Sequence, residues 1–191
     1  MKRLAVFASG SGSNFQAIVD AVGNGNLDAE ICLLVCDKPG AKVIERAEQA
    51  SIETFVFSPK EFASKVEFET LISEKLIEKN VDLVVLAGYM RLIGETLLTS
   101  FENKIINIHP SLLPAFPGKD AIGQAFRAGV EVTGVTIHYV DAGMDTGPVI
   151  AQAKVKVDAN DTIDSLTEKV HRIEHRFYPE TLKSIIKGSF L

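Results

Sequence analysis

The apolar stretch IINIH, residues 105–109, contains two polar side chains that could share one reaction, Asn107 and His109. Because residues two apart in a strand project to the same side, these two side chains are expected to point together. An imidazole accepts and returns a proton near neutral pH, and a carboxamide donates a hydrogen bond to an oxygen that becomes negative. Prolines at 110, 114 and 117 stiffen the loop that follows. The segment predicts an acid–base site, with a capping Asn and a structural His as the alternative.

A carboxylate is needed to orient such an imidazole, and the glycine-rich segment DAGMDTGP, residues 141–148, offers two. Either Asp141 or Asp145 could accept a hydrogen bond from His109 and stabilise its charged form. The spacing alone does not choose between them. His138 lies in the preceding strand-like run and is interpreted as a structural histidine.

The segment SGSGSNF, residues 9–15, follows a strand-like run and precedes a helical pattern. Its glycines let the backbone approach a ligand, and the amides at the start of a helix favour an anion. Gly10 and Gly12 match the dinucleotide fingerprint G-x-G-x-x-G, but Phe15 replaces its third glycine. Asp37 stands where an acid could bind a ribose. A bound phosphate is favoured over a dinucleotide or a tight turn without a ligand.

Residues 171–175 spell H-x-x-E-H, a pattern found in one class of zinc peptidases. His171 and His175 lie one helical turn apart and could chelate zinc together, with Glu180 as a nearby third candidate. A zinc hydrolase using His171, Glu174 and His175 is therefore one alternative function. The other interpretation of this helix face is that it contacts solvent or a ligand, and no metal is expected.

The elements that must position these residues alternate along the first two thirds of the chain. Strands are predicted at 3–8, 30–36, 54–57, 81–87 and 104–109, and helices at 14–22, 41–49, 61–78 and 95–100. This alternation predicts an α/β fold, an open and mostly parallel twisted sheet with helices on both faces. Asn107 and His109 then lie at the carboxyl end of the fifth strand, where such sheets bind ligands.

The pattern changes after residue 118. A helix is predicted at 119–128, and the runs 133–140 and 147–157 predict two antiparallel strands added at the C-terminal part of the sheet. A last helix is predicted to open near residues 161–162, because apolar residues recur there at steps of three and four. Pro179 is expected to kink or break that helix.

Composition limits the class of protein. A chain of 191 residues with 46% hydrophobic residues is expected to form one domain, and its net charge of −5 argues against a general nucleic-acid binder. The sequence has no apolar run of the length that a membrane span requires. Cys32 and Cys36 are too far apart on one strand to form a disulfide and are predicted to be buried thiols, as in a cytoplasmic protein.

Several motifs together resemble the phosphoribosylglycinamide formyltransferases of purine synthesis. The motif NIHPSLLP is followed by D-x-G-P-V-I, and ASGSGSN, LAGYMR and IEHRFYP extend the resemblance along nearly the whole chain. Methionyl-tRNA formyltransferases and formyltetrahydrofolate hydrolases share the catalytic fold but carry a further domain. We therefore expect residues 1–191 to form a single formyltransferase catalytic domain with a Rossmann-like formyltransferase fold.

The resemblance implies a reaction and a role for each residue of the acid–base site. The amine of phosphoribosylglycinamide (GAR) attacks the formyl carbon of 10-formyltetrahydrofolate, a tetrahedral intermediate forms, and tetrahydrofolate leaves. His109 is implied as the general acid and base, Asn107 as the oxyanion donor, and Asp145 as the group that tunes His109. The implied GAR-binding residues are Gly12, Ser13, Asn14 and Glu174. The implied folate-binding residues are Lys65, Met90, Arg91, Leu92, Ile93, Asn107, Asp141, Ala142, Gly143, Met144 and Asp145.

Lys65 departs from the pattern, because some relatives have an arginine there and a lysine lacks its bidentate fork. The expected partners are the two small-molecule substrates, without a metal, nucleic acid or membrane. The oligomeric state stays open, with a homodimer among the options. A non-catalytic nucleotide-binding module is a further alternative, in which segment 9–15 would bind a ligand and Asn107 and His109 would have no role.

Overall fold

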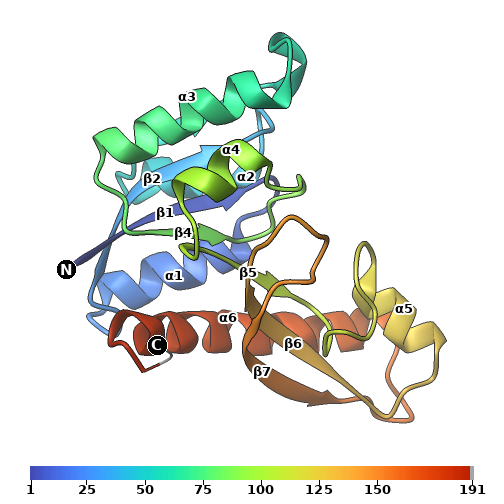
Figure 1. Ribbon diagram of the computed structural model, residues 1–191. Coiled ribbons are helices and arrows are strands. Elements are labelled where there is room, and N and C mark those ends of the chain that lie inside the picture. Colours follow the sequence, from blue (N-terminus) through green and yellow to red (C-terminus); the bar gives the residue numbers. More distant parts are fainter. Residues whose placement is uncertain (190–191) are drawn as a thin grey trace.

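A seven-stranded sheet runs through the centre of this computed structural model, which describes residues 1–189 (Figure 1). Its strand order is β3-β2-β1-β4-β5-β6-β7, with parallel pairing from β3 to β5 and antiparallel pairing of β6 with β5 and with β7. The strands are β1 (Lys2–Ala8), β2 (Ala29–Cys36), β3 (Thr54–Val56), β4 (Leu83–Leu86), β5 (Ile105–His109), β6 (Val132–Tyr139) and β7 (Val149–Lys156). The predicted fold class is confirmed.

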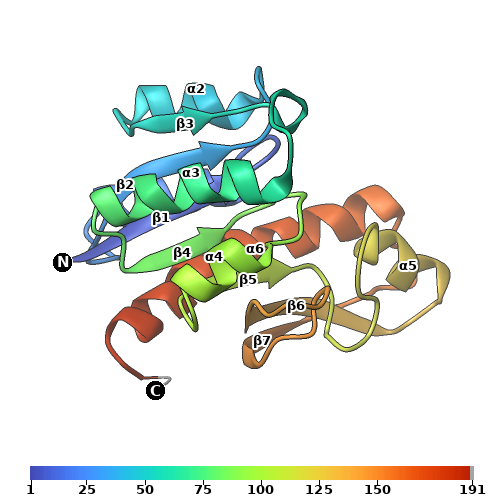
Figure 2. The same cartoon turned by 45° about the horizontal axis from the view of Figure 1, so that its top comes forward.

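Helices cover both faces of this sheet (Figure 2). One face carries α1 (Ser13–Gly23), α2 (Lys42–Gln49) and α6 (Ile163–Ile186), and the other carries α3 (Lys65–Glu78) and α4 (Glu95–Ser100). The short helix α5 (Ala121–Arg127) packs beside α6, and a single 3-10 turn, η1, spans Pro59–Glu61. The chain thus builds a three-layer arrangement in which the strands are enclosed.

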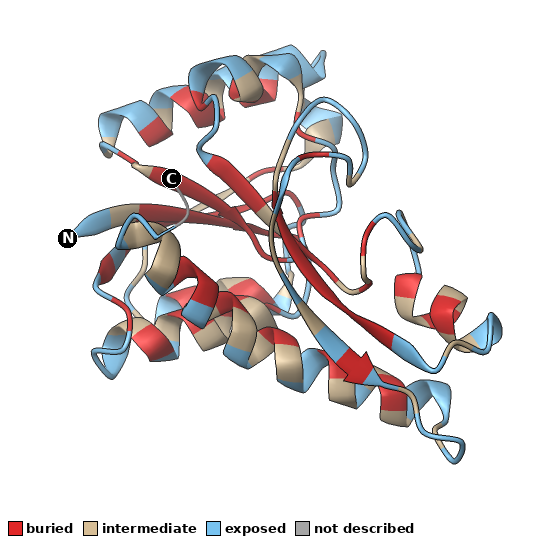
Figure 3. Ribbon diagram, turned by 60° about the horizontal axis from the view of Figure 1, so that its bottom comes forward, coloured by how far each residue is buried: buried red, intermediate tan, exposed pale blue. Residues whose placement is uncertain are grey.

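The alternation of residues along β1 divides the apolar core in two. Leu4 and Val6 pack with Tyr178 of α6 on one face, whereas Ala5 and Phe7 pack with residues of α3 on the other. All four strand residues are fully buried. Figure 3 shows that the central strands of the sheet are buried over most of their length. Burial on both faces explains why this strand reads as a continuous apolar run in the sequence.

One predicted helix boundary is wrong, and of the two outcomes expected at Pro179 the break does not occur. The helix predicted at 61–78 begins only at Lys65, because Ser64 caps it by accepting a hydrogen bond from the Glu67 amide at 3.2 Å. Pro179 does not break the last helix, which continues to Ile186. Tyr178 and Leu182 are buried on either side of the proline, so packing compensates for the helical hydrogen bond that proline cannot donate.

The remaining sequence predictions about the chain as a whole concern its cysteines and membrane spans. Cys32 and Cys36 are free, buried thiols, as predicted. Within residues 1–189, none of the helices combines the length and the apolar character that crossing a membrane requires.

Candidate active site

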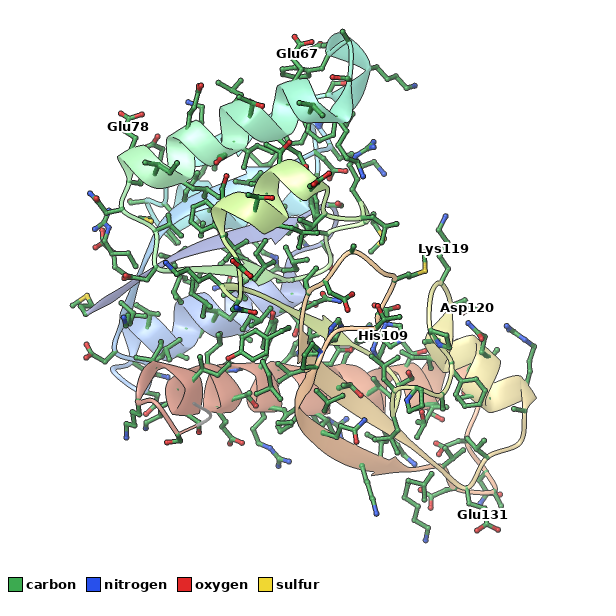
Figure 4. All side chains as sticks on the ribbon, in the orientation of Figure 1. Glu67, Glu78, His109, Lys119, Asp120 and Glu131 are labelled. Carbon is green, nitrogen blue, oxygen red and sulfur yellow. The ribbon has the colours of Figure 1, made fainter. Side chains whose placement is uncertain are left out.

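A cavity of about 680 Å³ opens at the carboxyl ends of β1, β4 and β5. The strand order reverses between β1 and β4, and the connections that leave them diverge there, which creates a crevice for ligands. The first half of α6, the loop 118–120 with the start of α5, and the loop 141–145 complete its wall. Figure 4 shows His109 at the end of β5, next to the segment that carries Lys119 and Asp120.

The predicted pair of polar side chains meets in this cavity. Asn107 and His109 both line it, as the alternation of a strand requires. The antiparallel pairing of β5 with β6 places Asn107 directly opposite His138. The pair therefore belongs to a larger cluster that includes a residue interpreted from the sequence as structural.

His138 holds the carboxamide of Asn107. Its Nδ1 lies 2.9 Å from the carbonyl oxygen of Tyr139, which can only accept, so Nδ1 carries the hydrogen of the neutral ring. Its Nε2 then accepts from Nδ2 of Asn107, at 3.3 Å. Burial lowers the pKa of His138, which keeps the ring neutral and Nε2 free to accept. One hydrogen of the Asn107 amide is thus fixed, and the other is available to a ligand oxygen.

The proline-rich loop determines which nitrogen of His109 can exchange a proton. Nε2 of His109 lies 2.9 Å from the carbonyl oxygen of Phe116, so it is the donor in that contact. The other nitrogen, Nδ1, lies 3.5 Å from Oδ2 of Asp145. Nδ1 is therefore the ring nitrogen left free to exchange a proton, and it lies beside a carboxylate.

The same loop positions Asp145 as well as His109. The hydroxyl of Ser111 donates to the Ala115 carbonyl at 2.6 Å, which fixes the turn that presents Phe116. Two residues after Phe116, the amide of Gly118 donates to Oδ2 of Asp145 at 2.9 Å. The stiff segment therefore connects the imidazole and the carboxylate, which lie far apart in the sequence.

The two candidate acids, Asp141 and Asp145, have different partners in the structure. Asp141 accepts from the Gly143 amide at 3.0 Å and from the Thr146 hydroxyl at 2.7 Å, and the latter bond is the main reason that its pKa is lowered. Its carboxylate therefore stabilises the conformation of the 141–146 loop. Asp145 faces both His109 and His138, whose Nε2 lies 3.8 Å from Oδ1 of Asp145. Asp145 is the acid in reach of the imidazole.

The residues predicted to bind GAR share one end of the cavity. Gly12, Ser13, Asn14 and Glu174 all line it, and Nδ2 of Asn14 donates to Oε2 of Glu174 at 2.7 Å. Glu174 is 5% exposed, and this burial raises the pKa of its carboxyl despite the hydrogen bond from Asn14. Gly12 has a φ of 74°, and a Cβ there would lie 2.5 Å from Cγ2 of Val43, so a larger residue would be strained.

The residues predicted to bind folate form the opposite wall. Met90, Arg91, Leu92 and Ile93 line the cavity, as do Asp141, Gly143, Met144 and Asp145. The side chains of Met90 and Met144 are more than 45% exposed, as is that of Leu92, which gives this end an apolar surface suited to an aromatic ring. Lys65 and Ala142 do not line the cavity, and the Lys65 ammonium instead donates to the Leu92 carbonyl at 2.8 Å.

The H-x-x-E-H motif is divided between two cavities. His171 and Glu174 line the cavity described above, whereas His175 lines a second one, of about 750 Å³, between α1 and α6. Within residues 1–189, no group of three or more His, Cys, Asp or Glu side chains is arranged to hold a metal ion. The residues of the motif therefore lie on two faces of one helix, and each face lines a different cavity.

Asp37 does not bind a ribose in the way that the dinucleotide comparison suggested. Its carboxylate is engaged by the Ser9 hydroxyl and by Arg91, and it does not line the cavity. Phe15, which replaces the third glycine of the fingerprint, is fully buried in the core. Both observations argue against a dinucleotide site at segment 9–15.

Known proteins share this fold and sequence over nearly their whole length. The chain is 58% identical to phosphoribosylglycinamide formyltransferase of Bacillus subtilis over 186 residues, 97% of this chain and 95% of that protein. It superposes on glycinamide ribonucleotide transformylase 1 from Geobacillus kaustophilus with a TM-score of 0.95 and 63% identity, covering 97% and 98% of the two chains. Phosphoribosylglycinamide formyltransferase from Bacillus halodurans also gives 0.95, with 54% identity and coverage of 98% and 97%.

The model of the formyl transferase family matches residues 2–182, which include every residue assigned above to the cavity wall. The match therefore covers the strands, the proline-rich loop and the first half of α6 that together build the site. This chain belongs to the formyl transferase family.

Proposed function

We propose that this chain transfers the formyl group of 10-formyltetrahydrofolate to the amine of GAR, giving formyl-GAR and tetrahydrofolate in purine biosynthesis. One observation carries the proposal. Asn107, Nδ1 of His109 and the Asp145 carboxylate converge in a cavity with a polar end at Gly12–Asn14 and Glu174 and an apolar end at 90–93. Such a cavity suits two substrates of different chemistry that meet at one reacting carbon.

The chemistry needs one proton transfer in each direction. A new carbon–nitrogen bond forms between the GAR amine and the formyl carbon, and Nδ1 of His109 accepts the proton that the amine loses. The free hydrogen of the Asn107 amide stabilises the negative oxygen of the tetrahedral intermediate. The bond from the formyl carbon to the folate nitrogen then breaks, and His109 returns the proton to that nitrogen. Asp145 stabilises the imidazolium between these two transfers.

The residues at the two ends suit the two substrates. A phosphate can accept from amides at the start of α1, around Ser13, and Glu174 attracts the GAR amine when its carboxyl is ionised. The exposed side chains of Met90, Leu92 and Met144 offer the pterin and its neighbouring ring apolar contacts. Small-molecule substrates, a cytoplasmic location and a single catalytic domain built on the one sheet belong to the same proposal.

A spectroscopic assay tests the function directly. The protein is mixed with 10-formyltetrahydrofolate and GAR, and the folate absorbance is followed, with each substrate omitted in turn as the control. The proposal predicts a change only when both are present, and an unchanged rate after treatment with a chelator. Absence of any change with both substrates would overturn it, and loss of turnover with the chelator would favour a metal-dependent enzyme.

A further inference from the structure

The acid that follows β2, Asp37, takes no part in the chemistry above, yet it is one of the few buried carboxylates in the described part of the chain. It is 8% exposed, and Ser9, which follows β1, is 5% exposed. Because β2, β1 and β4 are neighbours and parallel, the residues after each strand meet at one edge of the sheet. Asp37 and Ser9 therefore lie beneath the loop that follows β4, the loop that supplies residues 90–93.

Three hydrogen bonds link Asp37 to that loop. The Ser9 hydroxyl donates to Oδ1 of Asp37 at 2.5 Å, and its oxygen accepts from the Met90 amide at 2.9 Å. Nε of Arg91 donates to Oδ2 of Asp37 at 2.8 Å. A carboxylate only accepts, so it forces the Ser9 hydrogen toward itself and leaves the Ser9 lone pairs for Met90. Asp37 thus fixes the backbone of Met90 and the side chain of Arg91 together.

The contact constrains how the loop meets the cavity. Residues 90–93 all line it, and among them the Arg91 side chain is paired with Asp37, while its neighbours Met90 and Leu92 are 73% and 48% exposed. Only the carboxylate of this pair is buried, since the Arg91 side chain is 40% exposed. The effect of the pair is on conformation, because Arg91 cannot turn away without leaving Oδ2 of a buried carboxylate without its hydrogen bond.

The far end of the loop is held independently of Asp37. The Glu69 carboxylate accepts from the Gly94 amide at 2.8 Å, and Lys65 donates to the Leu92 carbonyl at 2.8 Å. Both come from α3, on the face of the sheet opposite to α1. Removing Asp37 is therefore expected to disturb residues 90–91 while leaving the loop attached.

We propose that Asp37 is a positioning residue for folate binding, which acts through Ser9 and Arg91 to present the apolar side chains of loop 90–93. This inference rests on the proposed function, because it assigns folate to that loop. Asp37 has no contact with the cavity itself, so its effect is on the affinity for folate and not on the GAR end or on proton transfer.

The test compares Asp37→Ala and Asp37→Asn with the wild type. Isothermal titration of the folded proteins with tetrahydrofolate and with GAR gives the two dissociation constants, and steady-state assays give the two KM values. Asp37→Ala should weaken tetrahydrofolate binding by about tenfold or more, the effect expected for losing hydrogen bonds to a charged group. GAR binding should change by less than about twofold. Asp37→Asn keeps an oxygen that accepts from Ser9 and should recover part of the loss.

Two further variants keep the test decisive. Asp82→Ala removes a carboxylate that accepts from the Arg3 amide at 2.8 Å at the opposite end of β1 and β4, so it should change neither affinity. If Asp37→Ala does not fold, Ser9→Ala tests the same link from the other side, because Ser9 does not line the cavity and accepts from the Met90 amide, and it should weaken folate binding alone. Equal loss of both ligands in either variant, or unchanged folate binding, would overturn the inference.

The outcomes separate this inference from the proposed function. A wild-type protein that turns over both substrates, together with an Asp37→Ala variant of unchanged folate affinity, contradicts the inference and leaves the function intact. A wild-type protein that binds no tetrahydrofolate contradicts both.

Discussion

Two parts of the cavity wall differ in how closely their polar groups are paired. We call the loop 90–93 the binding wall and the group Asn107, His109, His138 and Asp145 the reacting wall. At the folate end, Ser9, Asp37 and the loop after β4 are joined by hydrogen bonds of 2.5–2.9 Å. At the reacting end, one ring nitrogen of His109 and one of His138 are held by backbone carbonyls at 2.9 Å, but Nδ2 of Asn107, Nδ1 of His109 and Nε2 of His138 make side-chain contacts of only 3.3–3.8 Å. Binding groups are thus held in place in advance, whereas reacting groups keep donors and acceptors free for the substrate, and such contacts tighten when it binds.

The comparison predicts that damage to the reacting wall lowers kcat and damage to the binding wall raises KM. His109→Asn should give the largest effect, a fall in kcat of about 10²–10⁴-fold, because the group that moves the proton is gone. Steady-state assays at saturating substrates measure this. His175→Asn is the matched control, since His175 lines the other cavity, and its kcat should stay at the wild-type value. A zinc hydrolase would give the opposite result, with His175→Asn inactive.

Asn107→Ala should give the second largest effect, a fall in kcat of about 10²–10³-fold, because the oxyanion donor is lost. His138→Phe, which removes the acceptor that orients Asn107, should lower kcat by a smaller factor with both KM values little changed. Rapid-quench rates at saturating substrates give the chemical step for each variant. A larger loss in His138→Phe than in Asn107→Ala would mean that His138 acts on the substrate directly.

Glu174→Gln should stabilise the folded protein at high pH and at the same time weaken its binding of GAR. Because burial raises the pKa of Glu174, the folded protein binds more protons than the unfolded chain at pH values just above the ordinary carboxyl range, so this group makes stability fall as pH rises through that window. The variant should therefore show a higher Tm than the wild type at pH 8, with no advantage near pH 4, while its KM for GAR rises. A lower Tm at pH 8 would contradict this assignment.

The smallest effect is expected at Thr162, which does not itself line the cavity. Thr162 caps α6 by accepting from the Ser165 amide at 3.1 Å, and Thr162→Ala should cost about 1 kcal/mol, or a Tm lower by about 2–4 °C. Calorimetry measures the shift. Both kcat and KM should stay close to the wild-type values, since neither Thr162 nor Ser165 lines the cavity, and a larger change in either would show that the start of α6 is coupled to the site through its neighbour Ile163.

How much of this could be predicted depends on whether the information is local. Strand alternation placed Asn107 and His109 on one side, and apolar runs predicted the parallel sheet, because both depend on neighbours in the sequence. The choice between Asp141 and Asp145 could not follow from spacing alone, because it depends on how the 141–146 loop folds over the cavity.

His138 and Asp37 were harder for a different reason. A histidine within a strand and an acid after one have structural explanations that are equally consistent with the sequence. Their roles became visible only through partners from other strands, Asn107 for His138 and Arg91 for Asp37. The course of α6 through Pro179 is a third case, because buried contacts on both sides of the proline outweigh the lost hydrogen bond.

The assignment of proton transfer to Nδ1 of His109 is the claim on which the mechanism depends most. Nitrogen-15 NMR of the histidine-labelled protein distinguishes the two neutral tautomers, and His109→Asn identifies the signal. The predicted result is a neutral ring with its hydrogen on Nε2, bonded to the Phe116 carbonyl, and with an Nδ1 that carries no hydrogen and faces Asp145. A neutral ring that carries its hydrogen on Nδ1 would contradict the account.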